Sequence, residues 1–497
     1  MQHLNGQYIF SASDLVDYLE CPHLTTLNLR DLDEPLPRTE PDDEIVLRQE
    51  KGAQHERAHL ARLEQEGKRV RRIPDDAGLE ARVRLTREAM AEGADVIYQA
   101  TFVGDGFLGH VDFLRRVERL SAVGQHDYEV VDTKLARSPK ARFVVQLWLY
   151  SELLGRAQGV EPRSMHVVLG DDAERSFRVA NFARYCRNVQ KRFLEHVRTR
   201  PETYPKRCAH CPLCHWRELC EAQWEADDHL NRVAGITERQ IEKLQGAGVQ
   251  TLAALAGHEG TVPGIGTEIL ERLRRQAALQ LERHEMGKSR AELVKIPKGD
   301  TRGFARLPNP NAGDLFFDLE GDPYEPDGLE YLIGVHWLER GKPKYRAFWA
   351  HDRDAESASF EGFMDFVTEW LERHSKAHLY HYGHYEPTAL KRLMSLHGTR
   401  EAAVDDLLRE ERLVNLYNVV REAIRISESG YSLKDLEVFY MLGRESAVTT
   451  AMASVVWYER WREIGDESLL EDIRRYNEDD CRSLRLLRDW LLELRPA

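Results

Sequence analysis

The chain has 497 residues, of which 42% are hydrophobic and 31% are charged, and its formal net charge is −14. This length suits two to four domains, and the composition supports well-packed cores. No apolar run approaches the ~20 residues that cross a bilayer, and residues 1–6 lack the basic region and apolar core of a signal peptide. We therefore expect a cytoplasmic protein with no membrane partner.

Candidate active-site residues begin in the first 135 residues. A helical run that ends near Gly67 contains His55, and an apolar strand over 107–113 carries Asp112. A strand over 128–135 carries Asp132 and Lys134, which are two positions apart and therefore share a face. A metal-binding carboxylate beside an ammonium group suits phosphodiester hydrolysis, although an isolated Asp-x-Lys pair is more commonly a surface ion pair.

A helix predicted over 144–150 places Gln146 and Tyr150 at i and i+4, on one face. The order His, Asp, Asp-x-Lys, Gln-x-x-x-Tyr resembles the RecB-like branch of the PD-(D/E)xK nucleases over roughly residues 8–225. The resemblance implies that His55, Asp112 and Asp132 bind metal and that Lys134 is catalytic. It also implies that Gln146 and Tyr150 contact the nucleic-acid strand.

Four cysteines crowd into residues 208–220, namely Cys208, Cys211, Cys214 and Cys220. Their density favours a soft metal centre over free thiols, and an odd total of seven cysteines argues against a disulfide framework. Together with the remote Cys21, the Cys-x2-Cys-x5-Cys spacing resembles the iron–sulfur RecB-type nucleases. That resemblance implies a [4Fe–4S] cluster on Cys21, Cys211, Cys214 and Cys220.

Cys208 does not belong to that set, and a local Zn2+ site on the four clustered cysteines is the alternative. Cys186 and Cys481 are interpreted as packed thiols. No Gly-x4-Gly-Lys-Ser/Thr loop occurs in the chain, so the protein is not expected to drive its own unwinding of a duplex.

The middle of the chain is predicted to be helical. An amphipathic helix over 236–244 has Thr237 as its N-cap, and a turn with Gly264 and Gly266 leads into a helix over 267–274. Helix, glycine-rich turn and helix resembles the helix-hairpin-helix modules, which implies that Gly264 and Gly266 lie at a backbone phosphate. A plain helical spacer is the alternative interpretation.

A second group of acids lies in the last third of the chain. Asp318 and Glu320 are two apart on an apolar strand over 314–323, and burying both carboxylates is costly without a cation. A strand predicted over 378–386 ends at Glu386, and a helix that continues through Leu487 places Tyr476 and Asp480 at i and i+4.

This series resembles the DEDD exonucleases of the RNase H-like fold over roughly residues 310–497. The resemblance implies that Asp318, Glu320, Glu386 and Asp480 hold two Mg2+ or Mn2+ ions and that Tyr476 orients the water, for removal of nucleotides from a 3′ end. Two departures are present: the middle acid is Glu386 where the family has Asp, and Asp479 is an alternative last acid.

The whole pattern predicts an α/β multidomain protein that resembles a family of bacterial RecB-like nucleases. The predicted parts are a RecB-like, restriction-endonuclease-type core with the cysteines (1–228), a helix-hairpin-helix-like region (229–287), a linker (288–309) and an RNase H-like exonuclease domain (310–497). We expect a metal-dependent nuclease acting on DNA that is single-stranded or has free ends. The alternatives are an RNase and a nucleic-acid-binding scaffold with one or both sites inactive, partnering a separate helicase.

Overall fold

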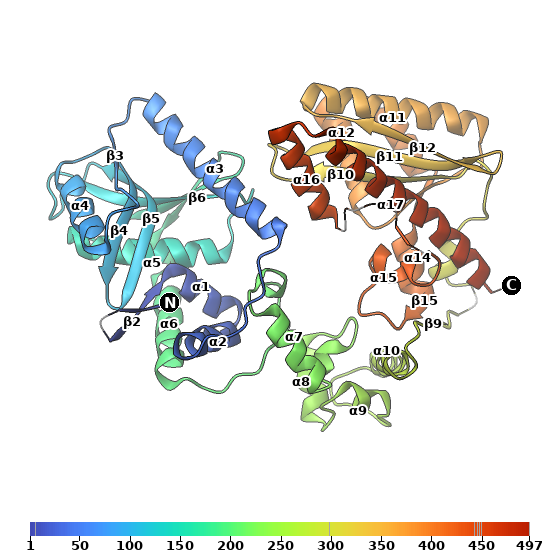
Figure 1. Ribbon diagram of the computed structural model, residues 1–497, viewed down its shortest axis with the longest axis horizontal. Coiled ribbons are helices and arrows are strands. Elements are labelled where there is room, and N and C mark those ends of the chain that lie inside the picture. The colour runs from blue at the N-terminus through green and yellow to red at the C-terminus, as the bar shows by residue number, and fades with distance from the viewer. Residues whose placement is uncertain are drawn as a thin grey trace. The chain divides into compact units, whose positions relative to one another are not determined.

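The chain divides into two compact units, Met1–Gln223 and Trp224–Ala497, and the division falls within helix α7 (Arg217–Ala226). The structure is a computed structural model that describes residues 1–4, 6–297, 299–441, 443–444, 446, 448 and 450–496. Each unit contains its own mixed sheet (Figure 1). Each also has its own hydrophobic core. Within these described ranges, no helix is both long and apolar enough to span a membrane.

The sheet of the first unit follows the order β1-β2-β5-β6-β7-β8, and β4 pairs with β5 and carries β3 at its other side. Its strands are β1 (Gln2–Leu4), β2 (Gln7–Ser11), β3 (Val70–Arg72), β4 (Val96–Gly104), β5 (Phe107–Val117), β6 (Asp127–Lys134), β7 (Ser164–Leu169) and β8 (Glu174–Arg178). Its helices are α1 (Ala12–Glu20), α2 (Pro22–Asp33), α3 (Asp43–Gln65), α4 (Leu79–Ala91), α5 (Ala141–Gln158), α6 (Val179–Thr199) and the short 3-10 helix η1 (Cys211–Leu213).

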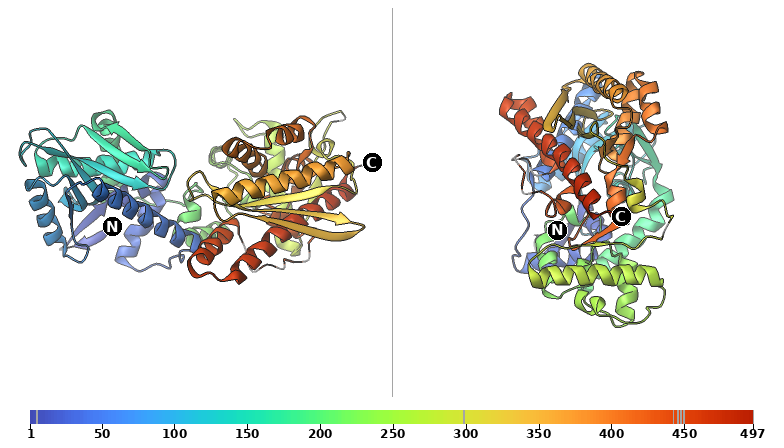
Figure 2. Two further views of the ribbon diagram at one scale, coloured as in Figure 1. Left: turned by 90° about the horizontal axis from the view of Figure 1, so that it is seen from above. Right: turned by 90° about the vertical axis from the view of Figure 1, so that its right-hand side faces the viewer.

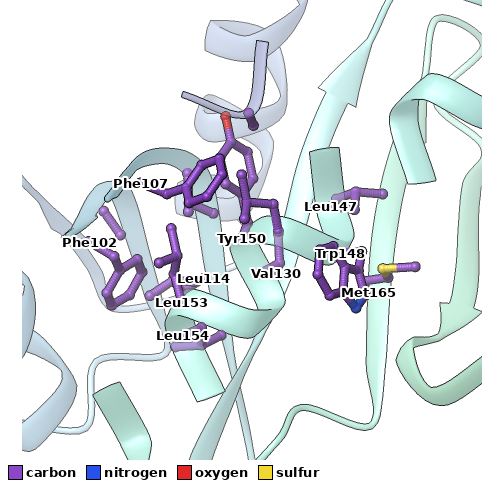
Figure 3. Packing of buried hydrophobic residues seen from close by; sticks show 14 of the residues in the cluster. Phe102, Phe107, Leu114, Val130, Leu147, Trp148, Tyr150, Leu153, Leu154 and Met165 are labelled. Atoms are coloured by element: carbon purple, nitrogen blue, oxygen red, sulfur yellow. The ribbon is translucent and has the colours of Figure 1, made fainter. Parts of the chain in front are cut away.

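Helix α5 supplies much of the core of the first unit. Its side chains pack against those of the central strands, as Figure 3 shows for Leu147, Trp148, Tyr150, Leu153 and Leu154 against Phe102, Phe107, Leu114, Val130 and Met165. The helix ends at Gly159, whose φ of 72° is the left-handed conformation that glycine adopts at no steric cost. This packing fixes the face of α5 that meets strand β6.

The second unit begins with a helical segment, as the apolar periodicity predicts. It contains η2 (Leu230–Arg232), α8 (Glu238–Gly246), α9 (Leu252–Ala256) and α10 (Thr267–Met286), packed around a small core that includes Leu244, Leu255 and Leu273. Thr237 caps α8 through a capping box with Gln240, which confirms the predicted N-cap.

The sheet of the second unit has the order β12-β11-β10-β13-β14, antiparallel between β12, β11 and β10 and parallel from β10 to β14. Its strands are β10 (Leu315–Asp322), β11 (Leu329–Glu339), β12 (Lys342–Trp349), β13 (Leu379–His381) and β14 (Leu413–Asn415). The helices are α11 (Arg353–Arg373), α12 (Tyr385–His397), α13 (Glu401–Arg409), α14 (Leu416–Ala423), α15 (Leu433–Glu437), α16 (Ala451–Ile464) and α17 (Glu467–Leu494).

Helices α11 and α17 cover opposite faces of this sheet. Alternate residues of β10, such as Phe317, share a core with α11, whereas Phe316 shares a core with Leu484 and Leu487 of α17. Figure 2 (left) shows α11 lying along the yellow strands. Because strand side chains alternate, Asp318 and Glu320 belong to the α17 face.

Residues 288–309 include a short strand, β9 (Ala291–Leu293), which pairs antiparallel with β15 (Ile424–Ile426), and a 3-10 helix, η3 (Gly303–Arg306). Gln276 of α10 donates a hydrogen bond to the Ile426 carbonyl at 2.8 Å. This hydrogen bond connects the helical segment to the two-stranded β9–β15 sheet within the second unit.

Candidate metal-dependent active sites

Three carboxylates converge between strand β10 and helix α17. Asp318 and Glu320 extend from β10, Asp480 extends from α17, and one oxygen of each lies within 4.8 Å of the others. Burial and the charges of Asp480 and Glu320 raise the pKa of Asp318 well above its usual value. Burial and the charge of Asp480 raise the pKa of Glu320 to about 8. The cluster is therefore poorly compensated by the protein alone.

Asn477, which was not predicted from the sequence, lies among these carboxylates. Its Nδ2 donates to Asp318 Oδ2 at 3.1 Å and lies 3.5 Å from Glu320 Oε1, while its Oδ1 accepts from the Tyr345 hydroxyl at 2.9 Å. The hydroxyl contact orients the amide so that its donor faces the acids. The signal in the sequence was the spacing, since Asn477 precedes Asp480 by three residues and so lies on the same helix face.

Gly334 makes room for Asn477. It lies directly opposite Asp318 in the β10–β11 register, and a Cβ at this position would come 1.6 Å from Asn477 Oδ1. A glycine is therefore required here by close approach, with its backbone lying against a side chain of α17.

The structure distinguishes the two adjacent aspartates of α17. Asp480 faces Asp318 and Glu320, and its Oδ1 accepts from Arg444 at 2.6 Å. Asp479 instead pairs with Arg482 at 2.9 Å and accepts from the Ser446 amide at 3.0 Å. The four-residue step from Tyr476 favours Asp480, and the structure places Asp480 in the cluster.

Glu386 reaches the same region from a helix, not from the end of a strand. The prediction of a strand over 378–386 was wrong beyond His381, because Gly383 has a φ of 110° and helix α12 begins at Tyr385. The buried Glu386 carboxylate lies 3.4 Å from His381 Nδ1, and its charge contributes to the raised pKa of Asp318. It lies near the three converging acids but outside their 4.8 Å group.

Tyr476 is buried one turn before Asp480. Lys434 Nζ lies 5.0 Å and Arg444 Cζ 5.5 Å from the centre of its ring. Burial and the charges of Asp480 and Glu320 raise the pKa of its hydroxyl, so this group stays protonated and can donate a hydrogen bond.

The donor set of this cluster fits a divalent cation. Carboxylate oxygens are the ligands that Mg2+ and Mn2+ prefer, and a bound cation would offset the mutual repulsion of Asp318, Glu320 and Asp480. Asp318, Glu320 and Asp480 could each offer one oxygen to a single ion.

The first unit contains a separate pair of carboxylates. Phe113 of β5 pairs with Val131 of β6, and Asp112 and Asp132 are the next residue on each strand. Lys134 Nζ lies 2.6 Å from Asp132 Oδ2, and Asp112 Oδ2 accepts from the Thr133 amide at 3.1 Å. Burial and the charge of Asp132 raise the pKa of Asp112. Burial lowers the pKa of Lys134, but the charges of Asp132 and Asp112 outweigh this effect, so the pKa of Lys134 is raised.

Helix α3 carries both His55 and Glu56, and of the two only Glu56 is shown to act on this pair. His55 Nε2 lies 3.5 Å from the Val168 carbonyl on β7, the strand next to β6. Glu56 accepts a hydrogen bond from Gln99, and its charge acts on both Asp112 and Lys134. Glu56 is a second candidate that was not predicted from the sequence, although it directly follows His55.

Gln146 and Tyr150 lie on one face of α5, as their spacing predicts. Gln146 Nε2 donates to the Tyr150 hydroxyl at 3.1 Å. Burial and the charges of Asp132 and Asp112 raise the pKa of that hydroxyl, which places it in the field of the carboxylate pair.

The structure gathers Cys21 with the four cysteines of residues 208–220. Cys208 Sγ lies 3.8 Å from Cys211 Sγ, and Cys21, Cys214 and Cys220 share a small cluster with Trp216. Burial raises the pKa of Cys211, Cys214 and Cys220, and neighbouring thiols add to each of these shifts. The largest cause of each shift is shielding of the sulfur from water, which disfavours the charged thiolate.

Cys186 and Cys481 are both fully buried away from these thiols, as the interpretation of packed cysteines predicts. In the helical segment, Gly266 is the N-cap of α10, and the Gly264 carbonyl accepts from Lys243 at 2.6 Å. Their contact with nucleic acid stays a prediction.

Residues 315–492 match the family model of the RNase_H superfamily. This match spans the sheet, α17 and the cluster of Asp318, Glu320 and Asp480, so the chain is a mixed α/β, multidomain protein with a C-terminal RNase H-like domain. No curated protein sequence matches the chain.

Proposed function

We propose that the protein is a metal-dependent nuclease acting on DNA that is single-stranded or has a free end, in DNA repair or processing. The observation that carries this proposal is the convergence of Asp318, Glu320 and Asp480 within a segment that matches the RNase_H superfamily. Divalent ions bound there would activate water and stabilise the leaving oxygen of a phosphodiester.

Four acids would hold Mg2+ or Mn2+ in this site: Asp318, Glu320, Glu386 and Asp480. Asn477 is a positioning residue that holds Asp318 and Glu320 in register with each other. Tyr476 would donate its hydroxyl proton in a hydrogen bond to the attacking water or to a phosphate oxygen. We propose that this site removes nucleotides from the 3′ end of the strand.

A second hydrolytic site is proposed in the first unit. Asp112, Asp132 and His55 would hold a divalent ion, and Lys134 would place its ammonium group beside the phosphate. Gln146 and Tyr150 would contact the strand. The burial of Asp132, which is only 1% exposed and lies beside Lys134, supports this assignment over a surface ion pair.

The cysteines are proposed to hold a structural [4Fe–4S] cluster through Cys21, Cys211, Cys214 and Cys220. The support is that Cys21, far away in the sequence, lies with the other cysteines. A Zn2+ site is the alternative. The sulfurs of Cys208 and Cys211 are 3.8 Å apart, which matches the sulfur–sulfur edge of a tetrahedral Zn2+ site with Zn–S bonds of about 2.3 Å, so this distance favours Zn2+ for that pair.

The experiment is release of label from end-labelled single-stranded DNA and from an RNA of the same sequence, with Mn2+. Wild type, Asp318→Ala and Asp132→Ala are compared. Loss in one variant assigns the chemistry to that site, and partial loss in both supports two working sites. Faster RNA cleavage would make the protein an RNase. No release by a wild type with its cysteine site filled would refute the proposal and favour a scaffold that partners a helicase.

A further inference from the structure

A recess of about 580 Å³ opens beside the N-terminal end of α12 in the second unit. The helical segment before α8 contributes one side, through Ala234 and Gly235, and the RNase H-like domain contributes the others. The side chains that matter for its chemistry are Tyr382, His384, Tyr417, Arg421 and Tyr431. Its volume lies within the range of pockets that hold small organic groups.

Aromatic rings line this recess. The rings of Tyr382 and Tyr417 meet edge to face, with centroids 5.5 Å apart, and both side chains are partly exposed. The Tyr382 hydroxyl donates to the Tyr431 carbonyl, which fixes the ring of Tyr382 against the segment that carries Tyr431. Partly exposed, fixed aromatic faces are the surfaces on which unpaired bases stack.

Arg421 supplies positive charge at the same place. Its guanidinium carbon lies 4.5 Å from the centre of the Tyr431 ring, and the residue is exposed. Among the residues that the structure describes, no carboxylate forms an ion pair with Arg421. An unpaired guanidinium stacked on an aromatic ring, in a chain with a net charge of −14, is suited to a phosphate.

Two connections place the recess next to the acidic cluster. The Tyr382 amide lies 3.4 Å from Glu386 Oε1, with the amide as donor. On the other side, Lys434 lies three residues after Tyr431, and its Nζ is 5.0 Å from the ring centre of Tyr476. A strand whose phosphate lies at the carboxylates would therefore have a nearby nucleotide at the recess.

We propose that this recess binds an unpaired base of a single-stranded nucleic acid and that Arg421 contacts the adjacent phosphate. The inference rests on the proposed function, because it assigns a subsite to the strand that the carboxylates would cleave. Stacking on tyrosine tolerates any base, so the recess would select for unpaired strands and not for sequence.

The test is the affinity of the full chain for a fluorescent oligothymidylate and for an abasic strand of equal length, measured by anisotropy without divalent ions. Tyr417→Ala should weaken binding of the oligothymidylate by about 5–150-fold, the equivalent of about 1–3 kcal/mol per stacked base, and leave the abasic strand unchanged. Arg421→Ala should weaken the binding of both strands. Tyr417→Phe keeps the ring and should bind as wild type does, which separates a stacking role from a folding defect.

Arg373→Ala is the matched control, because Arg373 is also exposed and lies 5.4 Å from an aromatic ring centre, that of Trp370, outside the recess. Unchanged affinity in both Tyr417→Ala and Arg421→Ala would overturn the inference, as would equal weakening by Arg373→Ala. Cleavage is measured separately. If the wild type cleaves while the recess variants bind normally, only the proposal of a base-binding recess is refuted. If the wild type binds through the recess but never cleaves, only the proposed nuclease activity is refuted.

Discussion

Gly334→Ala is the substitution for which the structure gives the sharpest expectation. The new methyl group would lie 1.6 Å from Asn477 Oδ1 and 2.7 Å from the Tyr345 hydroxyl, whereas real contacts of a Cβ are longer than 3.0 Å. Asn477 must therefore move by more than 1 Å. Its hydrogen bonds to Asp318 and Tyr345 would break, and Asp318 would lose the side-chain amide donor that α17 supplies.

The expected cost has two parts. Overpacking a close contact costs about 1–3 kcal/mol, and leaving buried polar groups without their partner costs about 1–3 kcal/mol. We expect Gly334→Ala to lower the free energy of unfolding of the second unit by about 2–6 kcal/mol. Asn477→Ala alone should lower it by about 1–3 kcal/mol.

The assay is urea-induced unfolding of wild type, both single variants and the double variant. Because alanine at 477 has no Oδ1 to collide with, the double variant should lose at least about 1 kcal/mol less than the sum of the single losses. Gly362→Ala is the matched control: this glycine lies in α11, where a Cβ would make only ordinary contacts with Phe348, so stability should hold or rise. Additive losses, or a Gly334→Ala variant as stable as wild type, would refute the reasoning.

Three further predictions concern separate features. Burial lowers the pKa of His336 to about 4, so below pH 6.5 the unfolded chain binds a proton that the folded chain does not. The free energy of unfolding should therefore fall by up to about 3 kcal/mol between pH 6.5 and 4. Urea unfolding of His336→Phe should lack this part of the pH dependence. Lys134→Met, assayed for DNA cleavage in an Asp318→Ala background, should lose about 10²-fold or more, and an unchanged rate would contradict the first-unit site. Cys21→Ser should lose bound iron on elemental analysis while Cys208→Ser retains it; zinc in the wild type would instead support the alternative metal.

The sequence was sufficient to locate the elements that hold Asp318, Glu320 and Asp480, but not the one that holds Glu386. Alternation along the strand predicted over 314–323 places Asp318 and Glu320 on one face, and the four-residue step from Tyr476 favours Asp480 over Asp479. In the structure Asp480 lies with Asp318 and Glu320. These are local periodicities, which the backbone imposes wherever the element forms.

Features that depend on tertiary contacts were not accessible in the same way. The strand expected to end at Glu386 stops at His381, because the positive φ of Gly383 and the start of α12 override the apolar pattern. Asn477 became a candidate only when α17 was seen to cross Gly334, a contact between residues 143 positions apart in the sequence. The recess likewise joins residues 234–235 to residues 382–432, which no local pattern connects.

The most direct test of the central claim compares Asp480→Asn with Asp479→Asn. Both variants remove one negative charge from adjacent positions of α17, but only Asp480 lies with Asp318 and Glu320. Mononucleotide release from single-stranded DNA is measured over a range of Mn2+ concentrations. We predict that Asp480→Asn abolishes the Mn2+-dependent release assigned to this site and that Asp479→Asn retains it. Equal activity of Asp480→Asn and wild type would contradict the account.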